Sequence, residues 1–170
     1  MNNKLMPFLA VLVLAACTSN VNTSQSPQEQ ASKQLTSRQH TEACAPINEV
    51  DVVNLFKRWN ASLQTGQPKA VVENYAKRSI LLPTLSGANR FTPQEKEAYF
   101  VHFLASKPTG EVTQRQIDIG CNIASDSGLY TFTLAKTGEK LDARYTFVYQ
   151  WDGQKWLIVS HHSSVLPTNE

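Results

Sequence analysis

The sequence predicts an α+β domain in which a curved antiparallel sheet is covered by three helices on its N-terminal side. Two observations lead to this class. Apolar residues recur with helical spacing in the first half of the folded region, and after Gly110 they alternate as in strands. The later segments are also separated by short turns that contain glycine, as in hairpins.

The first helix is predicted within residues 46–66, where four apolar residues form one helical stripe. Asn48 can cap its start, and Gly66 can end it. The stripe consists of Val52, Phe56, Trp59 and Leu63. A second, shorter helix is predicted over residues 69–76 because Pro68 is suited to a first helical turn.

A short buried strand is predicted over residues 79–83, and the third helix over residues 92–108. Thr92 and Pro93 form a favourable cap and first-turn pair for this helix. Four strands then follow within residues 111–119, 121–135, 141–151 and 155–164. Their short connections require an antiparallel meander, whose concave face, closed by the helices, is expected to hold a pocket.

Composition limits the classes of function. The chain has 170 residues, of which 41% are hydrophobic and 18% charged, so one globular domain with additional segments is expected. The net charge is only +2, and no basic stripe is present. A nucleic acid is therefore not an expected partner.

Residues 1–16 have the layout of a signal peptide, with Lys4 ahead of an apolar run that is too short to span a bilayer. The stretch from Leu14 to Cys17 resembles the lipobox of bacterial lipoproteins. That resemblance implies lipidation of Cys17 and, because Thr18 follows, an anchor in the outer membrane facing the periplasm. The alternatives are a plain signal peptide with a chance cysteine and a buried helix.

Residues 17–43 contain the lipidated Cys17 and a flexible tether, because they are rich in Ser, Thr, Gln and Asn and contain no aromatic residue. The folded domain is expected over residues 44–170. In an oxidising compartment Cys44 and Cys121 can form a disulfide that joins the start of the domain to the sheet, although two independent buried thiols remain an alternative.

The stretch WLIVSHHSSVLP, residues 156–167, places four polar side chains after an apolar run. Alternation along the strand separates His161 and Ser163 from His162 and Ser164. Counting from the apolar run puts His162 and Ser164 inward, and a bulge would reverse this. Because the two histidines point oppositely and no metal-binding spacing occurs, no metal site is predicted, with zinc and manganese left open.

Three other residues are candidates for the pocket. Thr84 follows a buried strand, Tyr99 lies on the inner stripe of the third helix, and Arg144 lies on a central strand where a charge needs a partner. Tyr99 is equally consistent with core packing, and Arg144 with an ion pair to Asp142 or Glu97. Asp126 and Asp118 are expected to be solvated.

Several stretches together resemble the association domain of calcium/calmodulin-dependent protein kinase II, within the cone-shaped nuclear transport factor 2-like fold. They cover most of residues 50–167 and include LLPTLS, DSGLYTFTL and the terminal ARYTFVYQWDGQKWLIVSHHSSVLP. Exported bacterial proteins of this kind that end in HHSS and then a proline resemble iota-class carbonic anhydrases.

The resemblance implies reversible hydration of CO2 to bicarbonate, by members that work without a metal in some cases and with one in others, and the absence of a ligand cluster in this sequence fits the metal-free form. Carried onto this chain, the pocket residues are Thr84, Tyr99 and a His/Ser pair from HHSS. The family register favours His161 with Ser163 over His162 with Ser164. A hydroxyl would hold water, Thr84 and Ser163 would bind developing negative charge together with Arg144, and the histidine would take or relay the proton.

Two other functions compete with this interpretation. One is a non-catalytic module that oligomerises or binds a small anion, and the other is an isomerase or dehydratase, which normally has a carboxylate base in the pocket. No inward acidic residue is expected here.

A homodimer is expected, because aromatic residues are predicted on the outer face of the sheet. These are Tyr130, Phe132, Phe147 and Tyr149.

Overall fold

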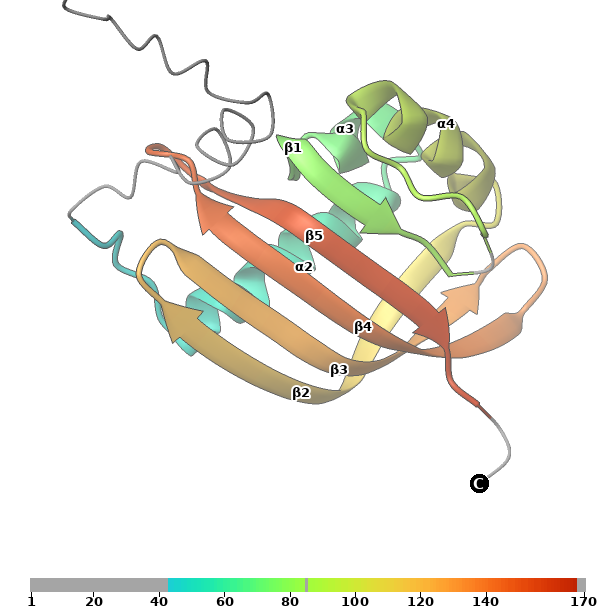
Figure 1. Ribbon diagram of the computed structural model, residues 1–170. Helices are drawn as coiled ribbons and strands as arrows, with labels where there is room; N and C mark the ends of the chain where they lie inside the picture. The colour runs from blue at the N-terminus through green and yellow to red at the C-terminus, as the bar shows by residue number, and fades with distance from the viewer. Residues whose placement is uncertain (1–42, 85, 168–170) are drawn as a thin grey trace, which may run out of the picture. The chain divides into compact units, whose positions relative to one another are not determined.

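The structure is a computed structural model that describes residues 43–84 and 86–167, in which a five-stranded curved sheet wraps around a long helix (Figure 1). The predicted α+β class, with helices at the N-terminal side of the domain, is confirmed. The predictions for the signal peptide, for Cys17 and for the tether up to residue 42 lie outside the described residues. Within the described part of the chain, no helix is long and apolar enough to cross a membrane.

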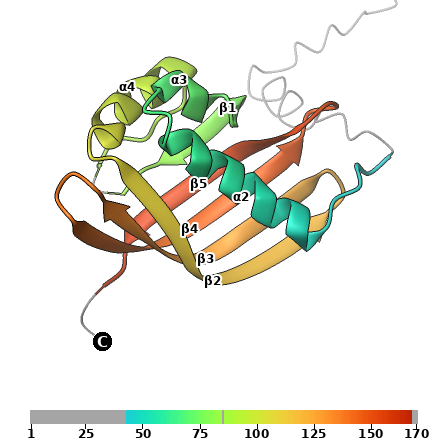
Figure 2. The ribbon, with the colours of Figure 1, turned by 180° about the vertical axis from the view of Figure 1, so that it is seen from behind.

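Three helices form where local signals predicted them, and their bounds are α2 (Glu49–Leu63), α3 (Pro68–Val72) and α4 (Pro93–Leu104). Asn48 caps α2 in a capping box with Asp51, and Thr92 caps α4 in the same way with Glu95. The predicted stripe of α2 is buried, together with Leu55. Figure 2 shows α2 lying across the concave face of the sheet.

The second helix is shorter than predicted, because the side chain of Asn74 ends it. The Asn74 amide donates hydrogen bonds to the carbonyl oxygens of Ala70, at 3.2 Å, and Val71, at 3.1 Å. The chain then enters strand β1 (Tyr75–Leu82) three residues after α3. Tyr75, predicted to be helical, therefore begins a strand and is buried in the core.

The remaining strands are β2 (Pro108–Gly120), β3 (Ile123–Leu134), β4 (Glu139–Trp151) and β5 (Trp156–Val165). They form the predicted antiparallel meander, in the sheet order β1-β5-β4-β3-β2. β1 pairs with β5 in parallel, so the sheet is mixed rather than purely antiparallel. The connection from β1 to β5 contains α4 and the other strands, and it is long enough to permit a parallel pair.

The sheet is strongly bent along β2 (Figure 1). The register between β2 and β3 shifts between Val112 and Gln114, which marks a bulge, and bulges bend strands. Gly128 lies opposite, and a Cβ atom at this position would collide with the carbonyl oxygen of Gln114. The absence of a side chain at Gly128 therefore allows the close approach of the two strands.

The aromatic residues expected on the outer face of the sheet lie on its inner face instead. All four are buried in the core against α2, and they are Tyr130, Phe132, Phe147 and Tyr149. Phe147, for example, packs edge-on against Trp59 with ring centroids 5.1 Å apart. The expectation of an aromatic outer surface was wrong because these positions share the parity that faces the helices.

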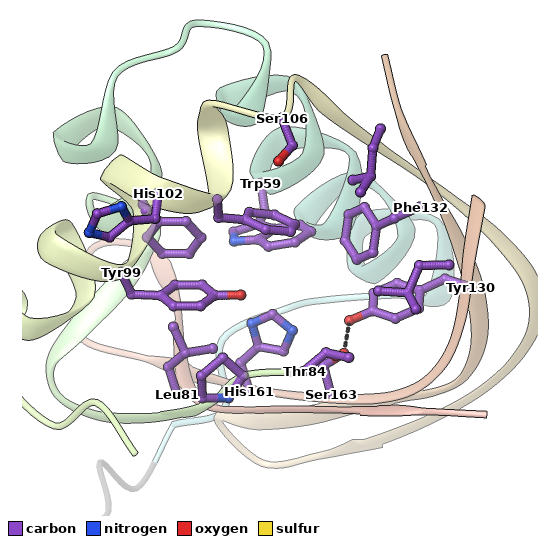
Figure 3. Close-up of a pocket in the computed structure, with 15 residues that line it drawn as sticks. Trp59, Leu81, Thr84, Tyr99, His102, Ser106, Tyr130, Phe132, His161 and Ser163 are labelled. Carbon is purple, nitrogen blue, oxygen red and sulfur yellow. Dashed lines mark hydrogen bonds between the residues drawn. The ribbon is translucent and has the colours of Figure 1, made fainter. Parts of the chain in front are cut away.

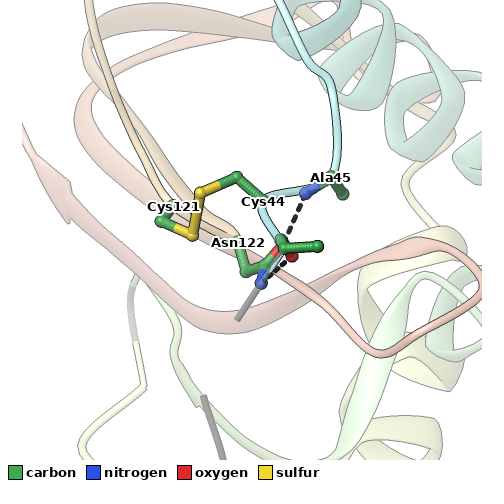
Figure 4. The surroundings of a disulfide bond; sticks show 5 residues. Cys44, Ala45, Cys121 and Asn122 are labelled. Atoms are coloured by element: carbon green, nitrogen blue, oxygen red, sulfur yellow. Dashed lines mark hydrogen bonds between the residues drawn. A yellow bond between two sulfur atoms is a disulfide. The ribbon is translucent and has the colours of Figure 1, made fainter. Parts of the chain in front are cut away.

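The predicted disulfide between Cys44 and Cys121 is present, with Cα atoms 4.8 Å apart (Figure 4). Beside it, the side chain of Asn122 accepts a hydrogen bond from the backbone nitrogen of Ala45 at 2.7 Å and donates one to the carbonyl oxygen of Ala43 at 3.1 Å. The start of the domain is thus attached to the turn between β2 and β3 by one covalent bond and two hydrogen bonds.

Candidate functional site

A cavity of about 260 Å³ lies between α4 and the concave face of the sheet, beside the end of β1. Aromatic and aliphatic side chains form most of its wall, and hydroxyl groups and the imidazole of His161 project into it, whereas the exposed imidazole of His102 points away from it (Figure 3). The polar groups come from elements far apart in the sequence. They belong to Thr84, Tyr99, His102, Ser106, Tyr130, His161 and Ser163.

The orientation of the HHSS segment is set by a bulge in β5. Tyr149 pairs with Ile158, whereas Val148 pairs with Ser160, so Val159 is an extra residue in β5. Beyond this point the alternation is reversed. His161 and Ser163 are buried and line the cavity, whereas His162 is exposed and Ser164 is half-buried on the opposite face.

The count that put His162 and Ser164 inward was therefore wrong, because it assumed a regular strand. The register implied by the family resemblance, with His161 and Ser163 inward, is the one that the structure has. His162 and Ser164 are not among the residues that line the cavity.

Three hydroxyl groups form a connected chain in the cavity wall. Tyr130 donates to the hydroxyl oxygen of Ser163 at 2.5 Å, and the hydroxyls of Ser163 and Thr84 are hydrogen-bonded to each other. The group has three hydroxyl hydrogens and makes two internal hydrogen bonds, so one hydrogen is left for a ligand. Burial raises the pKa of Tyr130, which keeps this hydroxyl protonated as a donor.

Tyr99 points its hydroxyl into the cavity from α4 (Figure 3). Burial raises the pKa of Tyr99 to about 12, and the guanidinium of Arg90, 6.0 Å from the ring centroid, opposes the shift without cancelling it. The hydroxyl is therefore protonated at neutral pH. Among the described residues it has no hydrogen-bond partner, so it can serve a bound molecule.

His161 is held between aromatic rings. Its ring stacks on Phe147 with centroids 3.9 Å apart and meets the edge of Trp59 at 5.1 Å. Nδ1 lies 2.8 Å from the hydroxyl of Tyr75, while Nε2 is buried and has no partner among the described residues. Burial, with a smaller effect from the nearby His162, lowers the pKa of His161 to about 3. So low a pKa keeps the ring neutral at neutral pH and makes it too weak a base for the expected role as a proton acceptor.

Arg144 does not reach the cavity. Its neighbours Ala143 and Tyr145 are buried on the inner face of β4, so Arg144 points to the outer face, where it is exposed. Its predicted contact with the substrate was wrong, and none of the ion pairs found among the described residues involves it. Solvent, rather than a carboxylate partner, satisfies this charge.

Sequence reasoning missed one buried acid. Asp126, expected to be solvated, is completely buried, with its carboxylate 2.9 Å from Nε of Arg115 and accepting a hydrogen bond from Tyr145 at 2.8 Å. Asp126 has the same parity on β3 as Tyr130, so the prediction of Tyr130 on the outer face also concealed the inward position of Asp126. It is inward but does not line the cavity, so it offers no base to a ligand there.

Tyr75 and Tyr130 were also missed as parts of the site. Tyr75 was assigned to a helix, and Tyr130 to the outer face of the sheet. Among the described residues, no His, Cys, Asp and Glu side chains gather in a group of three or more that could hold a metal ion.

Comparison with protein families gives one match. The family model for the calcium/calmodulin-dependent protein kinase II association domain matches residues 48–167. A search of curated proteins gives no match.

Solved structures share the fold. A protein of Xanthomonas campestris assigned to the same association-domain family is 41% identical, with a TM-score of 0.69 over 76% of this chain and 98% of its own. An iota-carbonic anhydrase from a cyanobacterium, complexed with bicarbonate, is 22% identical, with a TM-score of 0.64 over 72% and 94%. A nuclear transport factor 2-like protein of unknown function from Pseudomonas putida is 13% identical, with a TM-score of 0.63 over 75% and 99%.

Proposed function

The chain belongs to the calcium/calmodulin-dependent protein kinase II association domain family, and from that premise we propose that its cavity hydrates CO2 reversibly to bicarbonate. The observation that carries the proposal is the meeting of Thr84, Tyr99, His161 and Ser163 around one small, mainly apolar cavity. The family resemblance implies Thr84, Tyr99 and a His/Ser pair from HHSS for this reaction, and it favours His161 with Ser163 as that pair. The structural neighbour complexed with bicarbonate is consistent with it.

The cavity suits both partners of the reaction. CO2 has no net charge and little polarity, so an apolar wall accepts it without a large desolvation cost. Bicarbonate is an anion with three oxygen acceptors, and hydroxyl donors on one side of the wall can bind it. Among the described residues, no Asp, Glu, Lys or Arg side chain lines the cavity, so the donors proposed for the anion are hydroxyl and imidazole groups.

The proposed step needs no strong base. Water attacks the carbon of CO2 and forms the new C–O bond, while a hydroxyl of the Thr84–Ser163 pair accepts one proton from this water. The same hydroxyl passes its own hydrogen to an oxygen of CO2, so carbonic acid forms and the pair is unchanged. Carbonic acid then loses a proton to solvent and leaves as bicarbonate.

Tyr99 and His161 act on the other oxygen atoms in this scheme. As negative charge develops on oxygen, donors fixed in advance stabilise it more than solvent would. The high pKa of Tyr99 and the low pKa of His161 keep both groups neutral through the reaction. Because no group lowers the pKa of the attacking water, a modest rate is expected compared with zinc enzymes.

Stopped-flow measurement of CO2 hydration on the chelator-treated protein tests the proposal. Full activity without metal, and a large loss in Thr84→Ala, would support a reaction run by the cavity side chains. Activity that disappears on chelation and returns with zinc or manganese would replace it with a metal mechanism. An inactive protein that still binds bicarbonate would identify a non-catalytic anion-binding module.

Assembly and location belong to the same proposal. We propose a homodimer on the basis of family membership alone, since the aromatic residues that first suggested it are buried within the domain. We also propose that a lipid on Cys17 anchors the domain to the outer membrane, facing the periplasm. Light scattering tests the first proposal, and mass spectrometry of the wild type and Cys17→Ala tests the second.

A further inference from the structure

His161 presents its two ring nitrogens to different surroundings. Nδ1 lies 2.8 Å from the hydroxyl oxygen of Tyr75, in the buried core. Nε2 has no partner among the described residues, although the ring lines the cavity. The rings of Phe147 and Trp59 on either side fix the plane of the imidazole, so the nitrogens cannot exchange places easily.

The hydrogen on this ring can be placed by following the network from its far end. The indole Nε1 of Trp59 can only donate, and it lies 3.2 Å from the hydroxyl oxygen of Tyr75. Tyr75 must therefore accept this bond, and it has a single hydrogen of its own to give. Among the described residues, Nδ1 of His161 is the remaining partner of that hydroxyl.

Two arrangements are possible for the Tyr75–His161 contact. If Nδ1 carried the hydrogen, Tyr75 would accept two bonds and its own buried hydrogen would have no acceptor, which is costly. If Tyr75 donates to Nδ1, every buried hydrogen of the Trp59–Tyr75–Nδ1 network is used. The network therefore assigns the hydrogen of the neutral imidazole to Nε2.

We propose that Tyr75, itself held by Trp59, is a positioning residue that fixes His161 as the Nε2–H tautomer, a hydrogen-bond donor aimed into the cavity. With Tyr99 and the spare hydrogen of the Thr84–Ser163 pair, the cavity then offers three donors to its ligand. Such a set favours a small anion with several acceptor oxygens over a ligand that offers mainly hydrogen-bond donors. That this anion is bicarbonate rests on the proposed function.

Burial and charge agree with this assignment. Burial raises the pKa of Tyr75, although the hydrogen bond from Trp59 opposes the shift, so the phenol stays protonated and can donate. The ammonium of Lys96, 5.9 Å from the centroid of the Tyr75 ring, donates to the carbonyl oxygens of Ser79 and Phe91 and not to the phenol oxygen. Tyr75 therefore keeps both of its hydrogen bonds for Trp59 and His161.

The tautomer can be observed directly. In the 15N-labelled full chain at neutral pH, long-range correlations between ring hydrogens and nitrogens distinguish the two neutral tautomers and the charged ring. Signals of His161 are assigned by comparison with His40→Gln, His102→Gln and His162→Gln. We expect His161 to carry hydrogen on Nε2 alone, and a ring with hydrogen on Nδ1, or on both nitrogens, would overturn the proposal even if Tyr75→Phe did not fold.

Tyr75→Phe provides the second test, because it removes the hydroxyl and keeps the ring. We expect the His161 signals to shift toward a mixture of tautomers, and the affinity for bicarbonate to fall about tenfold, as for one lost hydrogen bond to an anion. Tyr130→Phe is the matched control, since it removes another buried hydroxyl of the cavity wall without touching Nδ1. An unchanged His161 spectrum in Tyr75→Phe would refute the role of Tyr75.

The spectrum separates this inference from the proposed function. A chain with the Nε2–H tautomer but without CO2 hydration would keep the inference and reject the function. An active enzyme whose His161 carries hydrogen on Nδ1 would keep the proposed function and reject the inference.

Discussion

Two groups of polar side chains lie on the concave side of the same sheet, and they differ in charge, because one contains a buried ion pair and the other contains no charged group. The ion-pair group consists of Arg115, Asp126 and Tyr145, and its carboxylate is buried away from the cavity. The cavity group consists of Thr84, Tyr99, Tyr130, His161 and Ser163, and it lines the cavity without any charged member. The ion-pair group neutralises its charges internally but leaves Nη2 of Arg115 and Oδ2 of Asp126 without a partner among the described residues, whereas the cavity group leaves uncharged donors unused.

The difference shows how burial separates a structural site from a binding site. A buried carboxylate is tolerated when a guanidinium and a hydroxyl contact it, and because this pair does not line the cavity, its remaining polar atoms are not offered to a ligand there. Burying a neutral hydroxyl or imidazole group with one unpaired donor costs much less free energy than burying an unpaired charge. A cavity lined by them can bind CO2 and stabilise an anion in turn.

The largest expected effect is on the ion-pair group. Arg115→Met leaves the carboxylate of Asp126 buried without its cation, so the free energy of unfolding is expected to fall by about 3 kcal/mol, the low end for a buried pair because Arg115 is partly exposed. Urea denaturation measures this. CO2 hydration per folded molecule should not change.

The matched control removes both charges. In Arg115→Met with Asp126→Asn, Tyr145 keeps an acceptor and no charge is buried, so most of the lost stability should return. A double variant no more stable than the single one would mean that packing by the arginine stem, and not the charge, stabilises this region.

Ser163→Ala is expected to have the next largest effect, and it acts on catalysis. Both Tyr130 and Thr84 lose their hydrogen-bond partner, so the rate of CO2 hydration should fall about 100-fold, as for the loss of a donor to developing negative charge. Stopped-flow assays measure this. Ser164→Ala changes the adjacent hydroxyl on the opposite face and should keep the rate, and equal losses in the two variants would contradict the assigned orientation.

The third prediction uses pH to test His161. Its pKa is about 3 in the folded protein, whereas an unfolded histidine titrates near about 6.5. Between these values the unfolded chain binds a proton that the folded one does not, so stability is full above this window and falls as pH falls. From about pH 6.5 to 5 the expected loss is about 2 kcal/mol.

Denaturation of the wild type and His161→Gln at several pH values isolates this contribution from that of the carboxylates. The difference in the free energy of unfolding between the two proteins should change by about 2 kcal/mol from about pH 6.5 to 5. The same pH dependence of stability in both proteins would mean that folding does not lower the pKa of His161. The ring could then not be assigned as a neutral donor.

Tyr99→Phe should have the smallest effect. It removes one unpaired hydroxyl from the cavity and leaves the packing against Phe103, whose ring stacks 5.7 Å away, unchanged. We expect kcat/KM to fall about tenfold with no loss of stability. A destabilised variant with unaltered kinetics would reassign Tyr99 to the core.

Elements with local signals were predictable from the sequence. The capping boxes at Asn48 and Thr92 and the hairpin turns of the meander depend on neighbouring residues, and they formed as expected. The bulge at Val159 was not predictable, because it depends on how β5 pairs with β4. The same is true of Tyr75, whose strand exists only because β5 provides an edge to pair with.

By itself the sequence determined the class of the fold, the residue types of the cavity and the possibility of a disulfide, since composition, periodicity and family resemblance are properties of the chain. The tertiary structure alone decided which histidine and serine face the cavity, that Arg144 faces outward and that Asp126 is buried. The reason is that a strand offers two faces. One extra residue in a bulge exchanges them, and only pairing with the neighbouring strand fixes where that residue lies.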